Sequence, residues 1–416
     1  MKKTFFLLSS MLLCMSSIAQ DDIRTYKIHN ANKENLTQYP VEINGIEGFR
    51  SALVTIDGKE VPCQMDDLDG DGGADQLFLL ADVGGKQSVE ATVKLWRKGK
   101  PREYRERTFA DLMLRNSKIS AKNKHDIYLG EFSSMRGTNP FLVIHQHGAV
   151  FESELTAFRI YCSPRQTVDI YGKRKRQLEL RESEFYPDQQ QLEDGFGDDV
   201  LVVGDGVGLG AINGWDGTKP IAFNDCDRRL QRIVASGPLR SIVDIVDKNW
   251  RPSPDAEPMT ITSRYTIIAG HRDCRVDVTV SVPKGFAFTK EMEATKYFTG
   301  ITNVKGSTQL NDGKGLRGCW GTDYPVTGRD TLTHEKETVG LGIYIPEKNV
   351  VKVADTERDY GYVVSMGNKK SLTYHITFCS DKEEEGYHSA KEWFAHLKAW
   401  KKEFGKKQLV CEQKKK

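Results

Sequence analysis

The sequence predicts an all-β protein that consists of a large domain and a smaller one. The clearest strand is residues 275–282, where four valines alternate with polar side chains, as in a strand that buries one face. Similar runs recur along the chain, and clusters of Gly, Asn, Asp and Pro separate them, which is typical of hairpin loops. Strands do not alternate with long helical patterns, which disfavours a parallel α/β fold. The other runs are residues 168–171, 239–246, 259–269, 341–345, 360–366 and 372–379.

Residues 1–19 are predicted to be a signal peptide. Lys2 and Lys3 precede an apolar run over residues 5–15, and a small-x-small cleavage pattern ends at Ala19. This run is too short to span a membrane, and no later segment is long and apolar enough to do so. Export to the periplasm is therefore expected. A lipoprotein anchor at Cys14 is the less favoured alternative, because Leu13 is too large for the position before a lipidated cysteine.

Residues 20–110 are predicted to form a small β module, with strands at 39–43, 51–56 and 89–96. The stretch 97–107 mixes acidic with basic residues and is predicted to be a solvated connector. Within the module, aspartates alternate with glycines in a pattern that suits a hard cation, so structural calcium is one expectation. A hairpin turn rich in Asp and Gly is the other. No other cofactor is expected. The candidate metal ligands are Asp67, Asp69, Asp71 and Asp75.

The larger domain is predicted over residues 111–385, and residues 386–416 are predicted to form a helix and a basic tail. In residues 389–404 large apolar side chains recur at helical spacing, and Ser389 is a suitable N-cap. This stripe, which includes Trp393, Leu397 and Trp400, is predicted to dock on the sheet. The lysine-rich tail that follows is predicted to be solvated.

Charge and cysteine content exclude several classes of partner. The chain has 60 basic and 58 acidic residues, and removal of Lys2 and Lys3 with the signal peptide balances them. Neither a nucleic acid nor an anionic membrane surface is therefore an expected partner. The cysteines outside the signal peptide are scattered and form no CxxC pair, which disfavours a zinc site. Their odd number leaves at least one thiol free even if disulfides form in the periplasm.

Residues 145–161 carry an unusual density of ionisable groups for a strand region. In a strand, residues two apart share a face, which pairs the two histidines, the two glutamates, and the arginine with the tyrosine. Histidines beside carboxylates move protons near neutral pH, so the segment is interpreted as the floor of a polar cleft. A ladder of salt bridges on a solvated face is the alternative. The candidate catalytic residues are His145, His147, Glu152, Glu154, Arg159 and Tyr161.

A second group of candidates surrounds the glycine-rich run 204–210. The run resembles a nucleotide-binding loop only superficially, since no helical pattern follows it. Glycines at alternate positions leave one face of the strand without side chains, which would allow close approach of a ligand or of another backbone. A tryptophan beside polar residues is suited to bind a sugar, because the indole packs on C–H groups and the polar residues bind hydroxyls. This composition occurs twice, at Trp215 and at Trp320. Both tryptophans are therefore predicted to border the cleft that contains His147. The candidate substrate-binding residues are Asp198, Asp199, Trp215, Asp216, Trp320, Asp323 and Tyr324.

Several long stretches resemble a known family. They are "QMDDLDGDGGADQLFLLADV", "HGAVFESELTAFRIY", "QTVDIYGKR", "FYPDQQQLEDGFGDDVLVVGDGVGLGAINGWDG" and "YTIIAGHRD", and the resemblance covers nearly the whole mature chain. They are similar to domain-of-unknown-function family 4861, a group of exported Bacteroidota proteins. The resemblance implies a large antiparallel β-supersandwich like that of galactose mutarotases and of the sandwich domains of polysaccharide lyases. It also implies a glycan ligand, because such proteins tend to be encoded beside polysaccharide lyases and unsaturated-uronyl hydrolases for pectin-like glycans. It carries over no catalytic residue.

The expected function is a periplasmic enzyme that acts on uronic-acid-containing, pectin-like oligosaccharides, with β-elimination by a lyase as the favoured reaction. Elimination needs a cation for the uronate carboxylate, a base for the C5 proton and an acid for the leaving oxygen. In this interpretation Arg159 neutralises the carboxylate and His147 is the base. Tyr161 or His145 is the acid.

Three alternatives remain open at this stage. A glycoside hydrolase would pair Glu152 or Glu154 with Asp198 or Asp199. A mutarotase-like epimerase would need only a histidine and a glutamate. A non-catalytic glycan-binding protein would use the two tryptophans as platforms. Convergence of His147, a glutamate and Arg159 in one pocket would favour catalysis over binding.

Overall fold

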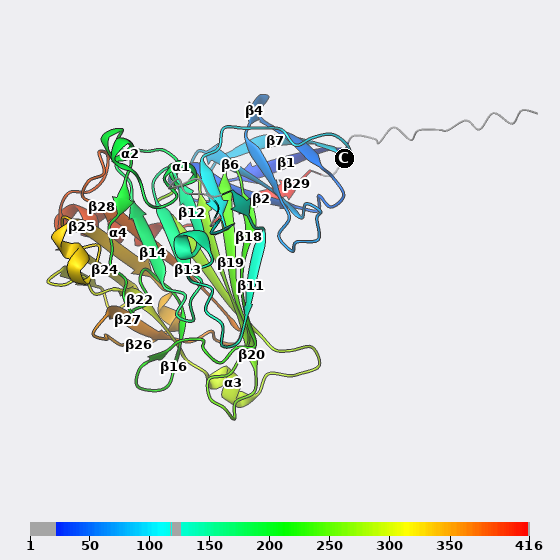
Figure 1. The fold of residues 1–416 in the computed structure, drawn as a ribbon. Coiled ribbons are helices and arrows are strands. Elements are labelled where there is room, and N and C mark those ends of the chain that lie inside the picture. The colour runs from blue at the N-terminus through cyan, green and yellow to red at the C-terminus, as the bar shows by residue number, and fades with distance from the viewer. Residues whose placement is uncertain (1–21, 117, 119–125, 415–416) are drawn as a thin grey trace, which may run out of the picture.

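The structure is a computed structural model that describes residues 22–116, 118 and 126–414. The expected signal peptide, residues 1–19, lies outside these residues. The predicted all-β supersandwich is confirmed, since antiparallel sheets dominate the described chain (Figure 1). Its α-helices are short except the last, and none in the described ranges is long and apolar enough to cross a membrane. They are α1 (Leu180–Ser183), α2 (Gln189–Glu193), α3 (Lys290–Ala294) and α4 (Ala390–Glu403), with 3-10 turns η1 (His145–His147), η2 (Gly328–Leu332) and η3 (Glu347–Asn349).

Two sheets that pack on a separate hydrophobic core form the small N-terminal module. Alternation explains the core: in β7 it buries Ala91, Val93 and Leu95, while the residues between them face outward. The first sheet has the order β29 (Val410–Gln413), β1 (Asp22–His29), β7 (Ser88–Trp96), β3 (Ser51–Ile56) and β4 (Lys59–Val61). The second has the order β2 (Leu36–Asn44), β6 (Gln76–Val83) and β5 (Cys63–Asp66).

The edge strand of this module comes from the far end of the chain. β29 pairs antiparallel with β1, with Tyr26 opposite Gln413 and His29 opposite Val410 (Figure 1). The lysine-rich tail therefore includes an edge strand over residues 410–413, although Val410, Glu412 and Gln413 are exposed. The reason is local: Leu409 and Cys411 pack against the core of the module, so this stretch gains apolar burial despite its lysine-rich surroundings.

The large domain packs one nine-stranded sheet, the back sheet, against two five-stranded sheets, the first and second front sheets. The back sheet has the order β11 (Glu131–Met135), β18 (Arg228–Ser236), β19 (Arg240–Trp250), β20 (Met259–Ile268), β21 (Asp273–Ser281), β28 (Ser371–Ser380), β25 (Glu337–Tyr344), β24 (Leu316–Asp323) and β23 (Thr308–Asn311). The first front sheet has the order β15 (Asp198–Asp199), β14 (Val168–Gly172), β13 (Ala157–Tyr161), β12 (Gly148–Ser153) and β8 (Thr108–Asp111). The second front sheet has the order β17 (Pro220–Ile221), β16 (Asn213–Trp215), β22 (Tyr297–Thr302), β27 (Asp359–Val364) and β26 (Val350–Val353), and β9 (Met113–Leu114) pairs separately with β10 (Ile127–Tyr128).

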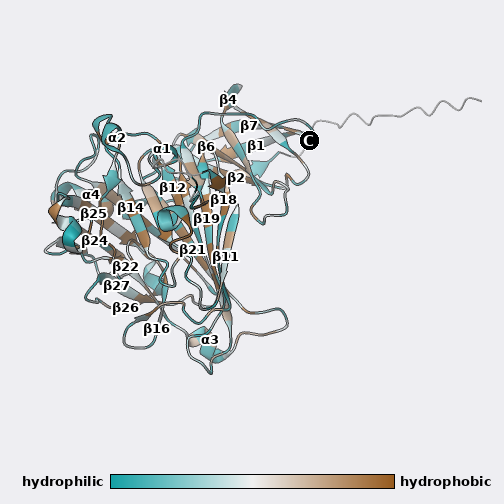
Figure 2. Cartoon of the chain, in the orientation of Figure 1, coloured by the Kyte–Doolittle hydropathy of each residue, from teal (hydrophilic) through white to brown (hydrophobic). Residues whose placement is uncertain are grey.

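One hydrophobic core lies between the back sheet and the two front sheets. Phe158 of the first front sheet meets Phe378 of the back sheet edge to face, with ring centroids 5.3 Å apart. Figure 2 shows apolar residues concentrated on the strands and polar residues on loops and on α3. The described cysteines are free thiols, and all except Cys411 are buried, so the structure uses them as small core residues.

The glycine-rich run joins the two front sheets. Gly208 bridges Val168 of the first sheet, and Leu209 bridges Ile301 of the second. Gly208 has a φ of 64°, and a Cβ atom there would lie 1.9 Å from the carbonyl oxygen of Val168, so no other residue fits. Of the two expected explanations for these glycines, the structure therefore shows close approach of another backbone.

The predicted C-terminal helix docks on the back sheet as expected. Trp393, Leu397 and Trp400 are buried in a cluster over β24 and β25, and the Ser389 side chain accepts a hydrogen bond from the Glu392 amide. Trp393 lies on Gly340, whose missing side chain leaves room for the indole. The apolar stripe is thus a packing face rather than a ligand site.

A buried polar contact fixes the N-terminal module to the large domain. Arg240, which is 3% exposed, donates from Nε to Asp66 Oδ2 at 2.6 Å, and its guanidinium lies 4.3 Å from the ring centroid of Phe78. Gln64 accepts from the amides of Leu239 and Arg240. These bonds satisfy the turn between β18 and β19, so module and domain meet through a specific interface.

Candidate functional site

The outer face of the first front sheet carries polar side chains where a sandwich would normally meet water. Strand alternation turns Phe158 and Ile160 towards the core and leaves Arg159 and Tyr161 of β13 on the opposite face. The segment 174–198, which contains α1, covers part of this face with Leu180 and Phe185. The polar groups are therefore held in a partly buried layer, which strengthens their electrostatic interactions.

Arg159 is the centre of this layer and is 2% exposed. Its Nη2 donates to Asp169 Oδ2 at 2.5 Å and to the Tyr161 hydroxyl at 2.7 Å, and its Nη1 donates to the Tyr186 hydroxyl at 2.5 Å. The carboxylate of Asp199 lies 3.6 Å from the same Nη2. One guanidinium thus positions two carboxyl groups and two phenols. We call these five residues the Arg159 cluster.

Asp199 differs from Asp169 in its environment. Burial, and then the charge of Asp169, raise the pKa of Asp199 well above its usual value, although Arg159 opposes this effect. The Asp199 side chain is still 24% exposed, so a ligand can reach it. Burial also raises the pKa of Tyr161, which keeps its proton and donates it to Asp169 Oδ2 at 2.7 Å. Asp199 is therefore the group of the cluster that is suited to donate a proton.

His147 lies at the rim of the Arg159 cluster, in a turn and not in the predicted strand. Gln146 and His147 both have left-handed backbone conformations, with φ of 57° and 63°, so η1 bends the chain before β12 begins. The His147 ring stacks on Phe141 with centroids 4.0 Å apart and lies 6.3 Å from the Tyr161 ring.

The hydrogen bond of His147 defines its tautomer. Nδ1 donates to the Phe141 carbonyl oxygen at 2.8 Å, which leaves Nε2 as the acceptor. Burial lowers the pKa of His147 below 6.5 despite this bond, and the charges of Arg159 and Arg115 lower it further. His147 is therefore a neutral base at neutral pH. Arg115 is an exposed cation close to it.

A second strained turn meets the first. Glu184 and Phe185 have φ of 47° and 71°, and Glu184 Oε2 accepts from His145 Nε2 at 2.7 Å. Left-handed backbone costs a residue with a side chain roughly 1–2 kcal/mol, and such strain concentrates at functional sites. Phe185 places its ring 3.9 Å from the Arg159 guanidinium carbon. Two strained turns, which contact each other through His145 and Glu184, therefore adjoin the same cluster.

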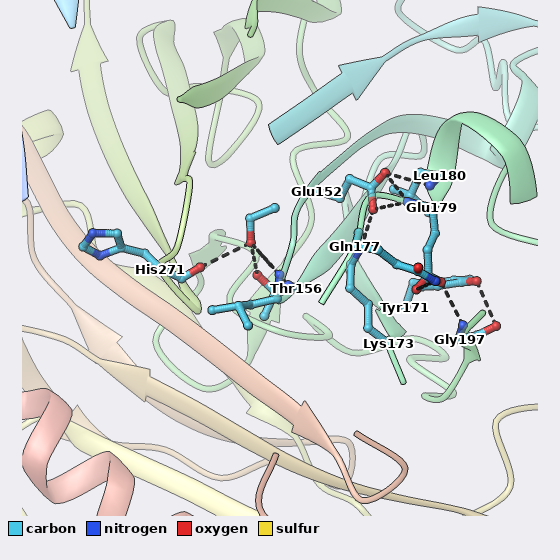
Figure 3. Close-up of polar contacts among 11 residues, drawn as sticks. Glu152, Thr156, Tyr171, Lys173, Gln177, Glu179, Leu180, Gly197 and His271 are labelled. Atoms are coloured by element: carbon cyan, nitrogen blue, oxygen red, sulfur yellow. Dashed lines mark hydrogen bonds and ion pairs between the residues drawn. The ribbon is translucent and has the colours of Figure 1, made fainter. Parts of the chain in front are cut away.

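The structure brings together His147, Arg159 and Tyr161 of the predicted catalytic residues, whereas His145 is buried and pairs with Glu184. Glu152 is completely buried and forms an ion pair with Lys173. Its oxygens also accept from the amides of Glu179 and Leu180, at 2.9 Å and 2.7 Å, at the start of α1 (Figure 3). A substrate cannot contact Glu152 in this arrangement, so its contacts are structural.

Glu154 is likewise occupied by the protein itself. It accepts from Arg107 Nε at 2.5 Å and from the Gly270 amide at 2.9 Å. It also lines a cavity of about 70 Å³ that includes none of the Arg159 cluster. Neither glutamate therefore converges with His147. Asp199 lies 3.6 Å from Arg159, whose charge also acts on His147.

Comparison with known proteins places the chain in a family. Residues 28–410 match the family model described as "Domain of unknown function (DUF4861)". The chain belongs to this family. A search of curated proteins found no match.

Among solved structures, this DUF4861 protein is remotely similar to two chains from Enterococcus faecalis. One is a protein in the glycosyl hydrolase family 38, at 9% identity and a TM-score of 0.42. The other is an alpha-mannosidase, at 10% identity and a TM-score of 0.41. Each match covers 94% of this chain but 47% and 46% of those chains, so this chain spans about half of their length.

The two predicted tryptophan platforms of this DUF4861 protein are not arranged around His147. Trp215 of β16 stacks on Phe298 in the second front sheet, with centroids 5.9 Å apart. Trp320 of β24 packs beside the cluster under α4 on the back sheet. The two indoles therefore belong to other sheets than β12, the strand that follows His147. Asp216 accepts from the amides of Thr218 and Lys219, as in an ordinary turn.

The aspartate loop of the module keeps both expected explanations open. One oxygen from each of Asp67, Asp69 and Asp71 lies within 4.8 Å of the others, which is compatible with a cation. Asp67 also accepts from the amides of Gly70 and Gly72, as a polar hairpin turn would. Asp75 is not part of the group, since its Oδ2 accepts from the Leu68 amide at 2.6 Å. Structural calcium remains a prediction.

Sequence reasoning missed several residues of the site. Asp169 gave a usable signal, because it is the charged residue within strand β14. Glu184 and Tyr186 gave none, because the covering segment has no hydrophobic period. Tertiary packing alone brings them to the Arg159 cluster.

Proposed function

We propose that this DUF4861 protein is a periplasmic lyase that cleaves uronic-acid-containing, pectin-like oligosaccharides by β-elimination at the outer face of the first front sheet. One observation carries the proposal: Asp199, an acid of raised pKa, belongs to the Arg159 cluster, and His147, a base of lowered pKa, lies at the rim of that cluster. Environments that separate two pKa values in this way are characteristic of acid–base catalysis.

Each step of the elimination has a group of suitable chemistry. His147 Nε2 takes the C5 proton, and the electron pair of that bond forms the C4–C5 double bond. The C4–O bond breaks as Asp199 donates its proton to the leaving oxygen. The exposed guanidinium of Arg115, near His147, neutralises the uronate carboxylate and so acidifies the C5 proton.

This assignment changes the expected role of Arg159. Its hydrogen bonds all go to side chains of the cluster, and it is too buried to contact a substrate carboxylate. Arg159 instead is itself the ionic partner of Asp199, and it positions the Tyr161 hydroxyl by a hydrogen bond. We therefore treat it as a positioning residue.

Two observations support a sugar as the ligand. Phe141, Tyr161 and Tyr186 are half-buried aromatic residues at the rim of the cluster, and aromatic faces pack well against sugar C–H groups. The resemblance to exported proteins encoded beside polysaccharide lyases points to the same class.

The test uses fragments of pectin, alginate, ulvan and glycosaminoglycan with the purified protein. Elimination creates a double bond conjugated to the carboxylate, so ultraviolet absorbance should rise. His147→Ala should lower the rate by roughly 10² to 10⁴-fold, since that is what general acid–base catalysis contributes. His29→Ala, which changes a half-buried histidine in the N-terminal module, is the matched control.

The pH profile separates the two catalytic groups. Activity should rise through the lowered pKa of His147, below pH 6.5, because the base must be neutral. It should fall as pH rises through the raised pKa of Asp199, because the acid must be protonated. Asp199→Asn should be slow and lack this second limb. New reducing ends without absorbance would indicate a hydrolase, and binding without change a glycan-binding protein; either result contradicts the proposal.

A further inference from the structure

The Arg159 cluster holds two carboxyl groups beside a single cation. Asp169 of β14 and Asp199 of β15 lie on neighbouring strands, and both are ionic partners of the Arg159 guanidinium. One positive charge cannot neutralise two carboxylates, so ionisation of both groups would leave an uncompensated negative charge in a buried layer. The hydrogen bonds of the two groups show which of them carries the charge.

Asp169 has the contacts of an ionised carboxylate. Its Oδ2 accepts from Arg159 Nη2 at 2.5 Å and from the Tyr161 hydroxyl at 2.7 Å. Its Oδ1 accepts from the Ile170 amide at 2.9 Å. The residue is 1% exposed, so these three donors take the place of water. Hydrogen bonds to a carboxylate favour its charged form.

Asp199 lacks comparable contacts. Its Oδ2 lies 3.6 Å from Arg159 Nη2, which is too long for a hydrogen bond. Its Oδ1 accepts from the Leu201 amide at 3.4 Å, which is longer than an ordinary hydrogen bond. The Tyr161 proton goes to Asp169 and not to Asp199. Asp199 is therefore the carboxyl group of the pair that is better suited to be protonated.

The charges around Asp199 differ in direction and in size. Burial raises the pKa of Asp199 most, and the charge of Asp169 follows, while the charge of Arg159 opposes both. The two phenols contribute no charge, because burial raises their own pKa values and they stay neutral. Asp169 is thus the charge that most favours a proton on Asp199. The titratable groups that face Asp199 are Arg159, Tyr161, Asp169, Tyr186 and Asp198.

We propose that Asp169 is a positioning residue for the acid of the reaction. By binding Arg159 and Tyr161 itself, Asp169 prevents a hydrogen-bonded ion pair between Arg159 and Asp199, so that Asp199 retains its proton for the leaving oxygen. Asp169 is too buried to contact the substrate, and it acts through Asp199 alone. This inference rests on the proposed function, in which Asp199 is the acid.

Removal of the Asp169 charge should release Arg159 to Asp199. In Asp169→Asn the repulsion between two carboxylates is lost, so the pKa of Asp199 should fall by roughly 1–3 units, as for an aspartate next to an arginine. The limb of the pH profile that reports Asp199 should move to lower pH by the same amount. Asp169→Glu retains a carboxylate and should keep this limb near its wild-type position. A merely structural role would lower the rate at every pH and leave the limb in place.

Carbon NMR of labelled aspartate side chains in the full chain tests the inference without substrate. Asp199→Asn identifies the Asp199 signal by its loss. In the wild type this carboxyl group should titrate well above 3.8, and in Asp169→Asn it should titrate roughly 1–3 units lower. Asp205→Asn, which removes an exposed carboxylate from its pair with Arg165, is the control and should leave the Asp199 titration unchanged.

The outcomes separate this inference from the proposed function. A lowered Asp199 titration in Asp169→Asn, with no elimination on any polymer, upholds the effect of Asp169 on Asp199 and overturns the lyase. Elimination with the same Asp199 titration in the wild type and in Asp169→Asn upholds the lyase and overturns the inference. An Asp199 group that titrates near 3.8 in the wild type also overturns the inference.

A second variant keeps the test valid if Asp169→Asn fails to fold. Tyr161→Phe removes one donor from the Asp169 carboxylate, which weakens its charged form. Part of the proton should then move from Asp199 to Asp169, and Asp199 should again titrate at lower pH than in the wild type. An unchanged Asp199 titration in Tyr161→Phe overturns the inference.

Discussion

Asp111 is a buried carboxyl group of the first front sheet. It lies on β8, is 7% exposed, and has the carboxyl groups of Glu184 and Glu152 near it. Burial, with Glu184 adding to it, raises the pKa of Asp111 to about 7 from an ordinary 3.8. The folded protein therefore binds a proton that the unfolded chain releases.

Asp111 should make stability depend on pH. Its folded pKa is raised, so its contribution is fully present below pH 3.8 and is lost as pH rises through about 7. Asp111→Asn should remove this dependence. The melting temperature of the variant should therefore rise relative to that of the wild type as pH increases. Thermal unfolding of both proteins between about pH 4 and pH 8 measures it. Asp255→Asn, at an exposed aspartate, should show a constant difference; an equally constant difference for Asp111→Asn would contradict the prediction.

At the same scale, sequence reasoning identified part of the site. The composition of residues 145–161 pointed to His147, Arg159 and Tyr161, which do converge. It also included Glu152, because a strand pattern shows which face a side chain takes but not what covers that face. The left-handed turn at Gln146 and His147 was not predictable either, because Gln is not enriched in that conformation and His, although enriched, still adopts it in a small minority of cases.

The covering segment 174–198 is the element on which the site depends. Its helix α1 spans a single turn and could not persist alone, because short helices are unstable without tertiary contacts. Glu152 anchors it by accepting from the Glu179 and Leu180 amides and by pairing with Lys173 (Figure 3). This anchor lies entirely within the protein.

Removal of the anchor should be costly. Glu152→Ala leaves Lys173 buried without its counter-ion, which typically destabilises a protein by about 3–5 kcal/mol. Urea unfolding measures the loss. Glu90→Ala, which breaks the exposed pair with Lys414, is the control and should cost about 1 kcal/mol or less. Similar losses for the two variants would show that Glu152 does not hold the segment.

The aspartate loop between β5 and β6 gives a prediction about metal. If Asp67, Asp69 and Asp71 bind calcium in the folded state alone, added calcium should raise the melting temperature, and a chelator should lower it. Calorimetry with and without chelator measures this shift. Asp67→Asn should abolish the shift. A melting temperature that changes with neither calcium nor chelator would contradict the prediction of a calcium site.

On the scale of the whole molecule, Arg240 couples the N-terminal module to the sandwich. Arg240→Ala leaves Asp66 buried without its partner, so the interface should weaken by about 3–5 kcal/mol. Calorimetry should then show two transitions where the wild type shows one, because each part keeps its own core. Arg102→Ala, at an exposed pair in the connector, should leave a single transition. A single transition in both variants would mean that the apolar contact of Phe78, Leu80 and Leu239 suffices.

The fold class was predictable because alternation and turn residues are local signals, and long strands such as β19, β20 and β21 carry them clearly. Sheet order was not predictable, because pairing partners come from distant parts of the chain. The bridging role of Gly208 illustrates this limit. The glycine run indicated a close approach, but only the fold shows that the approaching group is the backbone of Val168.

The pairing of β1 with β29 affects how the chain leaves the ribosome. Asn32 and Lys407 are hydrogen-bonded neighbours 375 positions apart. At about 5–20 residues per second, roughly 20 to 75 seconds separate their synthesis. During that time β1 presents an unpaired edge, and such edges promote association between chains. A nascent chain therefore carries an unpaired edge at β1 until residues 410–413 have been synthesised, because only then does the first strand have both of its neighbours.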